Sequence, residues 1–259
     1  MNGKFLKIIR IKEWVHFLGV PFLGYLFFVD SISAFSVIVI FIISIATLAF
    51  GFVVNYWADP GNRPVKTLLC ITFTLPIISI FLLVNQLIYP LIFWTLLIIA
   101  LCSYSIPPFT LKRFPLISTF INGFSLSLFF LFGSSFATSN LYSILLALFF
   151  GLHLIPPQIL HEFEDRKEDK KSGHRSMAHL FSPAALIRIT LALYLLIVII
   201  SYLISRANNF TFLFIATLLF SGFSMFTIKN KFTEDISRVR KKIKIAGIIY
   251  SLFILINLL

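Results

Sequence analysis

Five of the ten acidic residues of this 259-residue chain lie within eight positions, 162–169, directly after a long apolar run. Among them, Asp165 and Asp169 are four residues apart, a spacing that places both carboxylates on one face of a helix. Lysine and arginine residues surround the pair. Paired carboxylates beside cationic side chains suit a divalent metal ion that carries a phosphate-bearing substrate. We therefore predict a metal- and phosphate-binding site centred on Asp165 and Asp169.

A second oxygen-rich pair stands at the end of an earlier apolar run. Asn55 and Asp59 have the same spacing of four, and Pro60-Gly61 then predicts the end of the helix. The pair could also be an ordinary membrane-boundary asparagine and an aspartate beside a turn. Because the segment is expected on the same side as Asp165 and Asp169, we favour a second half of the same metal site.

A third candidate segment contains Tyr104, the tandem prolines Pro107-Pro108 and the basic pair Lys112 and Arg113. One interpretation is an interfacial tyrosine, a helix stop and charges that fix topology. The other is that Tyr104 faces a cavity, where its ring or hydroxyl stabilises developing positive charge, while the basic pair reaches an anionic group.

The segment 10–14 adds a fourth candidate, Lys12, at the entry to the first apolar run. It is either an anchor at the membrane boundary or a contact for phosphate. Pro156-Pro157 should bend the helix before the acidic segment, where broken backbone is tolerated beside a protein cavity. His153 and His161 flank these prolines, and a histidine there is most simply a hydrogen-bonded core residue.

The elements that position these residues must be membrane helices. The chain is 59% hydrophobic and 12% charged, with mean hydropathy +0.97, whereas soluble domains carry about twice that charged fraction. We predict an all-α integral membrane protein, a single domain over 1–259 in which nine transmembrane helices surround a central cavity. The predicted spans are 13–29, 32–56, 67–87, 88–104, 114–137, 140–160, 183–204, 210–228 and 243–259.

The charge distribution predicts the orientation of these spans. The N-terminus and the loops near 57–66, 105–113, 161–182 and 229–242, with their flanking helix ends, hold 21 of the 22 Lys and Arg residues, and only Arg206 falls on the other side. This asymmetry predicts a cytoplasmic N-terminus and an outside C-terminus. The net charge of +12 is thus a topology signal that also favours membrane lipids, and nucleic acid is not an expected partner.

These motifs resemble those of the UbiA superfamily of intramembrane prenyltransferases. Asp165-x-x-x-Asp169 with the following Gly173-His-Arg175-Ser176 matches the second aspartate motif of that family. Tyr104-Ser-x-Pro-Pro matches another of its elements, and His161-Glu162-Phe163 is similar to the Asn-Glu-Phe lead-in of the naphthoate-prenylating branch. The resemblance covers nearly the whole chain, and nine spans with a cytoplasmic N-terminus are the architecture of the family.

The first aspartate motif departs from the family pattern, Asn-Asp-x-x-Asp-x-x-x-Asp followed by Asn-x-x-Arg-Pro. Asn55 and Asp59 are in register, but Tyr56 replaces the first aspartate, the third is absent, and Asn62-Arg63-Pro64 arrives early. Two metal-binding carboxylates are therefore missing. A two-Mg²⁺ site could have weakened, lost an ion, or recruited Glu162 or Glu164.

The resemblance implies a Mg²⁺-dependent transfer of a polyprenyl group from a prenyl diphosphate to an aromatic, quinone-precursor-like or other lipophilic acceptor. In that interpretation the metal ligands are Asn55, Asp59, Asp165 and Asp169, with Glu162 a further candidate. The diphosphate would be neutralised by Arg63, Lys112, Arg175 and Lys12, with Asn55 also beside it. Tyr104, Asp165 and Asp169 are the candidate catalytic residues.

Two alternatives stay open at this point. A terpene cyclase of the same superfamily would use a prenyl diphosphate without an acceptor, and a non-catalytic or transporter-like descendant would bind an anion. Against a transporter, the charged residues lie at one membrane face rather than at mid-membrane. The expected location is the bacterial inner membrane; oligomeric state is not predicted.

Overall fold

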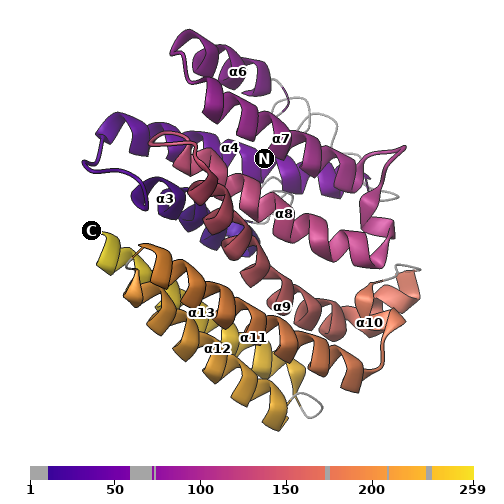
Figure 1. Ribbon diagram of the computed structural model, residues 1–259. Coiled ribbons are helices and arrows are strands. Elements are labelled where there is room, and N and C mark those ends of the chain that lie inside the picture. Colours follow the sequence, from indigo (N-terminus) through magenta and orange to yellow (C-terminus); the bar gives the residue numbers. More distant parts are fainter. Residues whose placement is uncertain (1–10, 59–71, 73, 173–175, 209, 232–234) are drawn as a thin grey trace. The chain divides into compact units, whose positions relative to one another are not determined.

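The computed structural model describes residues 11–58, 72, 74–172, 176–208, 210–231 and 235–259, and within these ranges all regular structure is helical (Figure 1). The elements are α2 (Ile11–Trp14), η1 (Val15–Leu18), α3 (Gly19–Leu26), α4 (Ala34–Ala58), α6 (Thr74–Val84), α7 (Ile88–Ser105), η2 (Leu111–Arg113), α8 (Pro115–Ser134), α9 (Leu141–Ser172), α10 (Met177–Leu180), α11 (Pro183–Asn208), α12 (Thr211–Lys231) and α13 (Ile236–Leu258). The all-α prediction is confirmed.

Among the described residues, six segments are long and apolar enough to cross a membrane, by length and composition. They are Ala34–Ala58, Ile88–Ser105, Pro115–Ser134, Leu141–Lys167, Pro183–Asn208 and Thr211–Lys229. The predicted spans 13–29 and 67–87 contain the shorter apolar helices Val15–Leu26 and Thr74–Val84. The ninth predicted span lies in α13, whose first turns carry five basic residues. Nine spans therefore stay a prediction.

Prolines mark where several helices begin and end. Pro115 and Pro183 occupy the first positions of α8 and α11, where the missing N–H is not needed and the fixed φ suits a helix. Pro107 and Pro108 follow the end of α7 at Ser105, as the tandem prolines predict.

The described helices form two compact units, Met1–Leu111 with Ser125–Ala147, and Lys112–Phe124 with Leu148–Leu259. We call them unit 1 and unit 2. The division falls within α8 and within α9, so that each of these helices contributes to both units. The single-domain organisation stays a prediction, and each unit is described by itself.

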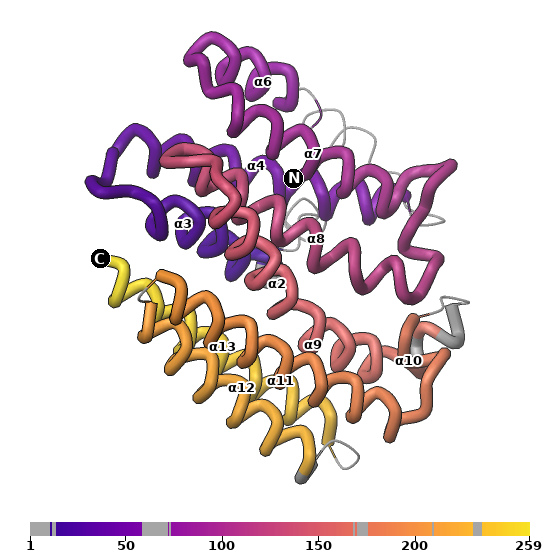
Figure 2. Tube along the Cα trace, in the orientation of Figure 1, coloured from indigo at the N-terminus to yellow at the C-terminus, as the bar shows by residue number. Residues whose placement is uncertain are grey.

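In unit 1, α4 and α7 lie side by side and run in the same direction, with α6 against α7 (Figure 2). The Trp94 indole donates a 2.9 Å hydrogen bond to the Thr47 hydroxyl, which satisfies two polar groups at an apolar interface. Helices α3 and α8 also pack closely. A side chain at Gly24 of α3 would collide with the Phe130 carbonyl of α8, so this contact requires glycine.

In unit 2, α11, α12 and α13 lie side by side (Figure 1). The start of α8 packs closely on α9, since a Cβ at Gly123 would lie 2.9 Å from the Gly151 carbonyl. His153 of α9 faces Tyr250 of α13 at 3.3 Å, and its other ring nitrogen faces the Phe149 carbonyl at 3.0 Å. His153 is thus a hydrogen-bonded packing residue.

Candidate active site

The acidic segment is helical rather than a loop. The sequence predicts a cytoplasmic loop over 161–182, but α9 continues through Pro156 and Pro157 as far as Ser172. The extension is rich in Glu, Lys and Arg, which are good helix formers. Asp165 and Asp169 are therefore one helical turn apart on α9, both half-buried, and the predicted spacing on one helix is confirmed.

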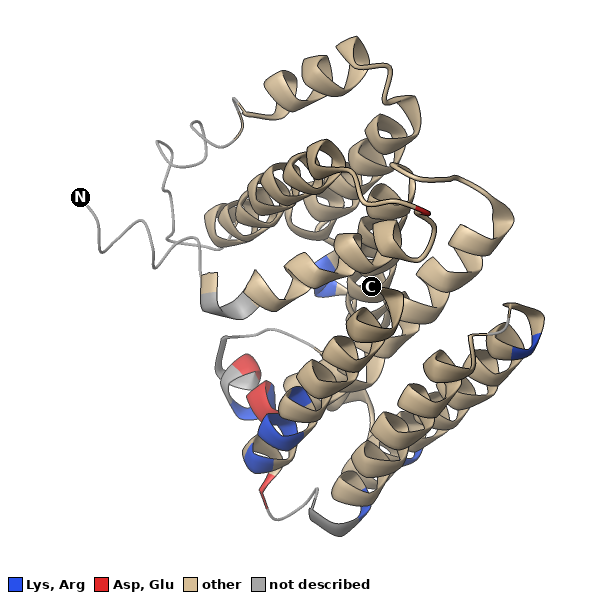
Figure 3. Ribbon diagram, turned by 90° about the vertical axis from the view of Figure 1, so that its left-hand side faces the viewer, with Lys and Arg blue, Asp and Glu red and all other residues tan. Residues whose placement is uncertain are grey.

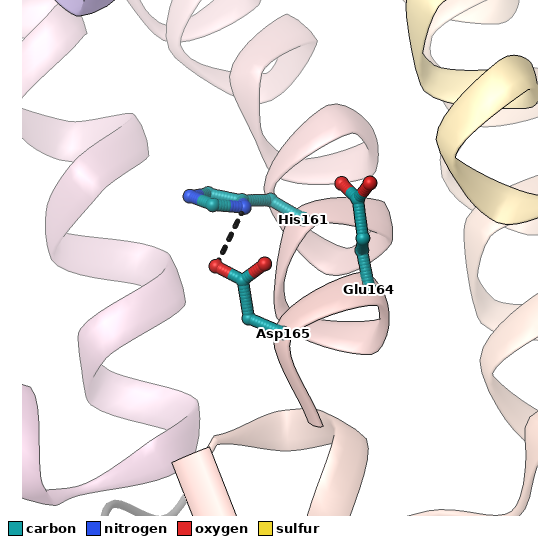
Figure 4. Close-up of side chains that lie close together, drawn as sticks. All are labelled: His161, Glu164 and Asp165. Carbon is teal, nitrogen blue, oxygen red and sulfur yellow. Dashed lines mark ion pairs between the residues drawn. The ribbon is translucent and has the colours of Figure 1, made fainter. Parts of the chain in front are cut away.

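Asp165 lies beside two other potential metal ligands on α9 (Figure 4). His161 Nδ1 is 3.1 Å from Asp165 Oδ2, and the side chains of these two residues are 46% and 41% exposed. Figure 4 shows them pointing to the same side of the helix, with the Glu164 carboxylate on the adjoining side. One ligand atom from each of the three lies within 4.8 Å of the other two.

Glu164 forms an ion pair with Arg240 of α13. Their side chains are 27% and 32% exposed, so solvent screens the pair only partly. Burial lowers the pKa of the Arg240 guanidinium, which still carries its charge at neutral pH. In Figure 3 the charged residues lie mainly at helix ends, and the ion pair between Glu164 and Arg240 joins α9 to α13. This pair fixes the acidic extension against α13.

Glu162 is the buried member of the acidic cluster, with 7% exposure. Its Oε1 accepts hydrogen bonds from the Thr119 hydroxyl at 2.7 Å and the Gln158 amide at 3.2 Å. Its Oε2 accepts from the Met177 backbone N–H at 2.9 Å. Both oxygens thus hold α8, α9 and α10 together, which favours a structural role over the metal ligation considered from sequence.

The short helix α10 is tied back to α9 by a second contact. His179 Nε2 lies 3.0 Å from the Arg166 carbonyl oxygen. Its Nδ1 accepts from the Ser176 backbone N–H at 3.2 Å, within a capping box. With Glu162, this contact fixes the start of α10 beside the end of α9.

Unit 1 contains the other half of the predicted site. Asn55 lies near the end of α4, and its Oδ1 accepts a 3.0 Å hydrogen bond from the Ser105 hydroxyl at the end of α7. Tyr104 precedes Ser105 on α7 and is half-buried. The parallel packing of α4 and α7 therefore brings the Asn55 and Tyr104 segments together, although they are about 50 residues apart in sequence.

The remaining predicted residues are only partly described. Lys112 belongs to η2 and is half-buried, and Lys12 lies in α2, with its side chain outside the described part of the structure. Asp59, Arg63 and Arg175 lie outside the described residues. The pairing of Asn55 and Asp59 with Asp165 and Asp169 joins residues of different units and stays a prediction.

Sequence reasoning missed the residues that support the acidic cluster. Arg240 belongs to the basic segment near 229–242, whose charges indicate topology, and no sequence motif marks Thr119 or Gln158. A signal for Glu162 was available, because Ile155, Ile159 and Glu162 follow a helical i, i+4, i+7 pattern. All three are buried, so Glu162 continues the apolar stripe of α9.

The model of the UbiA prenyltransferase family matches residues 60–248, which is most of the chain. This chain belongs to that family. No curated protein matches it significantly.

Solved structures of UbiA-type proteins share the fold of this family member. A structure of digeranylgeranylglyceryl phosphate synthase has a TM-score of 0.75 at 24% identity, covering 98% of this chain and 97% of that one. A UbiA homologue from Archaeoglobus fulgidus, bound to GPP and Mg²⁺, has a TM-score of 0.73 at 16% identity and 99% coverage of both chains. At these identities, the likeness supports a UbiA-like fold.

The donor set in unit 2 fits a divalent ion. Asp165 and Asp169 supply carboxylate oxygens one turn apart on a partly exposed helix. Such oxygens are the ligands that Mg²⁺ prefers, and one or two of them usually suffice when a phosphate group completes the coordination.

Proposed function

We propose that this UbiA family member transfers a prenyl group from a prenyl diphosphate to a lipophilic acceptor in the membrane. The observation that carries the proposal is the Asp165–Asp169 pair on the polar extension of α9, in a chain of a prenyltransferase family. Structures of the Archaeoglobus fulgidus homologue contain GPP or DMAPP together with Mg²⁺. These ligands make prenyl diphosphates the first donors to test.

In this proposal Asp165 and Asp169 would hold Mg²⁺, with Asn55 and Asp59 as further ligands. A bound Mg²⁺ ion neutralises negative charge on the diphosphate. The Ser105 hydroxyl, which donates to Asn55 Oδ1, fixes the direction of the amide oxygen. Glu162 holds α9 in place rather than contacting the ion.

Basic side chains receive the diphosphate as it leaves. We assign this role to Arg63, Lys112, Arg175 and Lys12, because guanidinium and ammonium groups form strong charge-assisted hydrogen bonds to phosphate. The bond between the first prenyl carbon and the diphosphate oxygen breaks, and its electron pair leaves with the diphosphate. The allylic cation that remains would face the Tyr104 ring, whose π electrons attract positive charge.

An electron-rich carbon of the acceptor then forms the new bond to the first prenyl carbon, and its proton passes to a carboxylate or to water. We propose an aromatic acceptor of the quinone-precursor type, in an enzyme of the bacterial inner membrane with a cytoplasmic N-terminus. The charge asymmetry of the loops supports the orientation.

The test is incubation of the purified protein with Mg²⁺ and DMAPP, GPP or longer prenyl diphosphates, alone and with acceptors. The acceptor series contains phenolic and naphthoic acids and a prenylated glyceryl phosphate. Diphosphate release that requires an aromatic acid is the expected result. Release without acceptor, together with a cyclic hydrocarbon, would identify a cyclase instead. Absence of turnover with every donor would point to a non-catalytic descendant.

A further inference from the structure

His161 is not used in the mechanism proposed above, although it lies against Asp165. The nitrogen and two carboxylate oxygens of His161, Asp165 and Glu164 lie within 4.8 Å of one another. We propose that His161 and Asp165 chelate a divalent ion that accepts nitrogen ligands, such as Mn²⁺, with Glu164 as a third ligand. This inference rests on the proposed function, since Asp165 is assigned there to the metal that accompanies the diphosphate.

The separation of the two atoms suits a shared ion. Ligand atoms about 2.1 Å from one metal and about 90° apart lie about 3 Å from each other. His161 Nδ1 and Asp165 Oδ2 are 3.1 Å apart. A spacing of four on a helix places both groups on one face, so the pair can bind an ion without movement of the backbone.

Solvent reaches the side chains of both proposed ligands. Those of His161 and Asp165 are 46% and 41% exposed, whereas Glu162 is 7% exposed. Glu164 is held by Arg240, but an ionised carboxylate has about four lone-pair sites. It can therefore keep its ion pair while it turns one oxygen to a metal, and Arg240 limits the negative charge of the cluster.

A nitrogen ligand changes which metal the site prefers. Mg²⁺ favours oxygen ligands alone, whereas imidazole suits first-row transition metals. The segment that begins at Asn55 has tyrosine, Tyr56, where the family pattern has an aspartate. An imidazole ligand on α9 would raise the affinity of this site for Mn²⁺ relative to Mg²⁺.

Pulsed electron paramagnetic resonance on Mn²⁺ tests the nitrogen ligand directly. The purified full-length protein in detergent is titrated with Mn²⁺, without substrate, and examined for modulation by imidazole ¹⁴N. We expect modulation in the wild type and its loss in His161→Gln, with Mn²⁺ affinity about tenfold weaker and Mg²⁺ affinity little changed. His179→Gln is the matched control. Because His179 is hydrogen-bonded to Ser176 and to the Arg166 carbonyl, this substitution should leave the ¹⁴N signal intact.

Three outcomes overturn the inference: bound Mn²⁺ without ¹⁴N modulation, modulation that persists in His161→Gln, or no Mn²⁺ binding at millimolar concentration. In the first case His161 merely orients Asp165 through a hydrogen bond. These results are distinct from failure of the proposed function. If the wild type shows the ¹⁴N signal but no turnover with any prenyl diphosphate, the metal site stands and the transferase proposal fails.

Discussion

The two regions that carry the family motifs differ in how their polar side chains are held. On α9 of unit 2, Glu162 accepts three hydrogen bonds and Glu164 pairs with Arg240. At the α4–α7 corner of unit 1, the Oδ1 atom of Asn55 accepts a hydrogen bond from the neutral Ser105 hydroxyl. Carboxylates need fixed partners because like charges repel one another and are costly to bury, whereas a neutral amide carries no such charge.

Under the proposed function, we expect the α9 extension to contribute more to the binding of metal and diphosphate than the α4–α7 corner does. The sequence supports this expectation, since the first motif has lost two carboxylates and the second has kept both. Four predictions test the difference, in order of expected effect.

The largest effect is expected from Asp165→Asn and Asp169→Asn. Each removes a charge from the proposed metal site, and turnover should fall by a factor on the order of 10³, as when a stabilising group is lost from an active site. Steady-state diphosphate release measures the loss. Asp30→Asn, in the turn between α3 and α4, is the charge-matched control and should retain activity. Near-normal rates in either site variant would refute the metal assignment.

Glu162→Ala should mainly affect stability. It leaves the Gln158 amide and the Met177 N–H without this acceptor, whereas the Thr119 hydroxyl can still donate to the Pro115 carbonyl. Buried unpaired donors cost about 1–3 kcal/mol each. We expect a loss of roughly 3 kcal/mol, measured as thermal unfolding in detergent. Thr119→Ala should cost about 1 kcal/mol. If Glu162→Ala instead abolished metal binding in a fully folded protein, Glu162 would be a ligand after all.

Asn55→Ala should reduce kcat/KM for the donor about tenfold, which corresponds to about 1.4 kcal/mol. The effect should be smaller than that of Asp165→Asn because a neutral amide contributes less to ion binding than a carboxylate does. Ser105→Ala removes only the group that orients Asn55 and should act more weakly. An equal loss from Asn55→Ala and Asp165→Asn would show that the two regions share the ion evenly.

The smallest effect concerns the Glu164–Arg240 ion pair. A double-mutant cycle with Glu164→Gln and Arg240→Gln should give a coupling energy of about 1 kcal/mol, since the pair is about 30% exposed and solvent screens it. The measurement is the thermal unfolding of the four proteins at low and high salt. Absence of coupling would mean that α13 does not hold the acidic extension through this pair.

Much of the site's local geometry could be predicted from sequence. The apolar runs and scarce charges gave the membrane helices, and the spacing of Asp165 and Asp169 gave their common helix, which the structure contains. The extent of that helix was not predicted, because a run of charged residues after a membrane span suits a solvated loop as well as a solvated helix.

Hydropathy and spacing are local properties, so the chain alone determined the helical class, the membrane environment and the neighbouring positions of the carboxylates. Only the tertiary structure decided which carboxylates are buried or paired with other helices. Glu162 is buried by Thr119, 43 residues earlier, and Glu164 is paired with Arg240, which belongs to another helix. Such contacts depend on how helices pack, and close packing is set by shape over the whole interface rather than by a pattern within one segment.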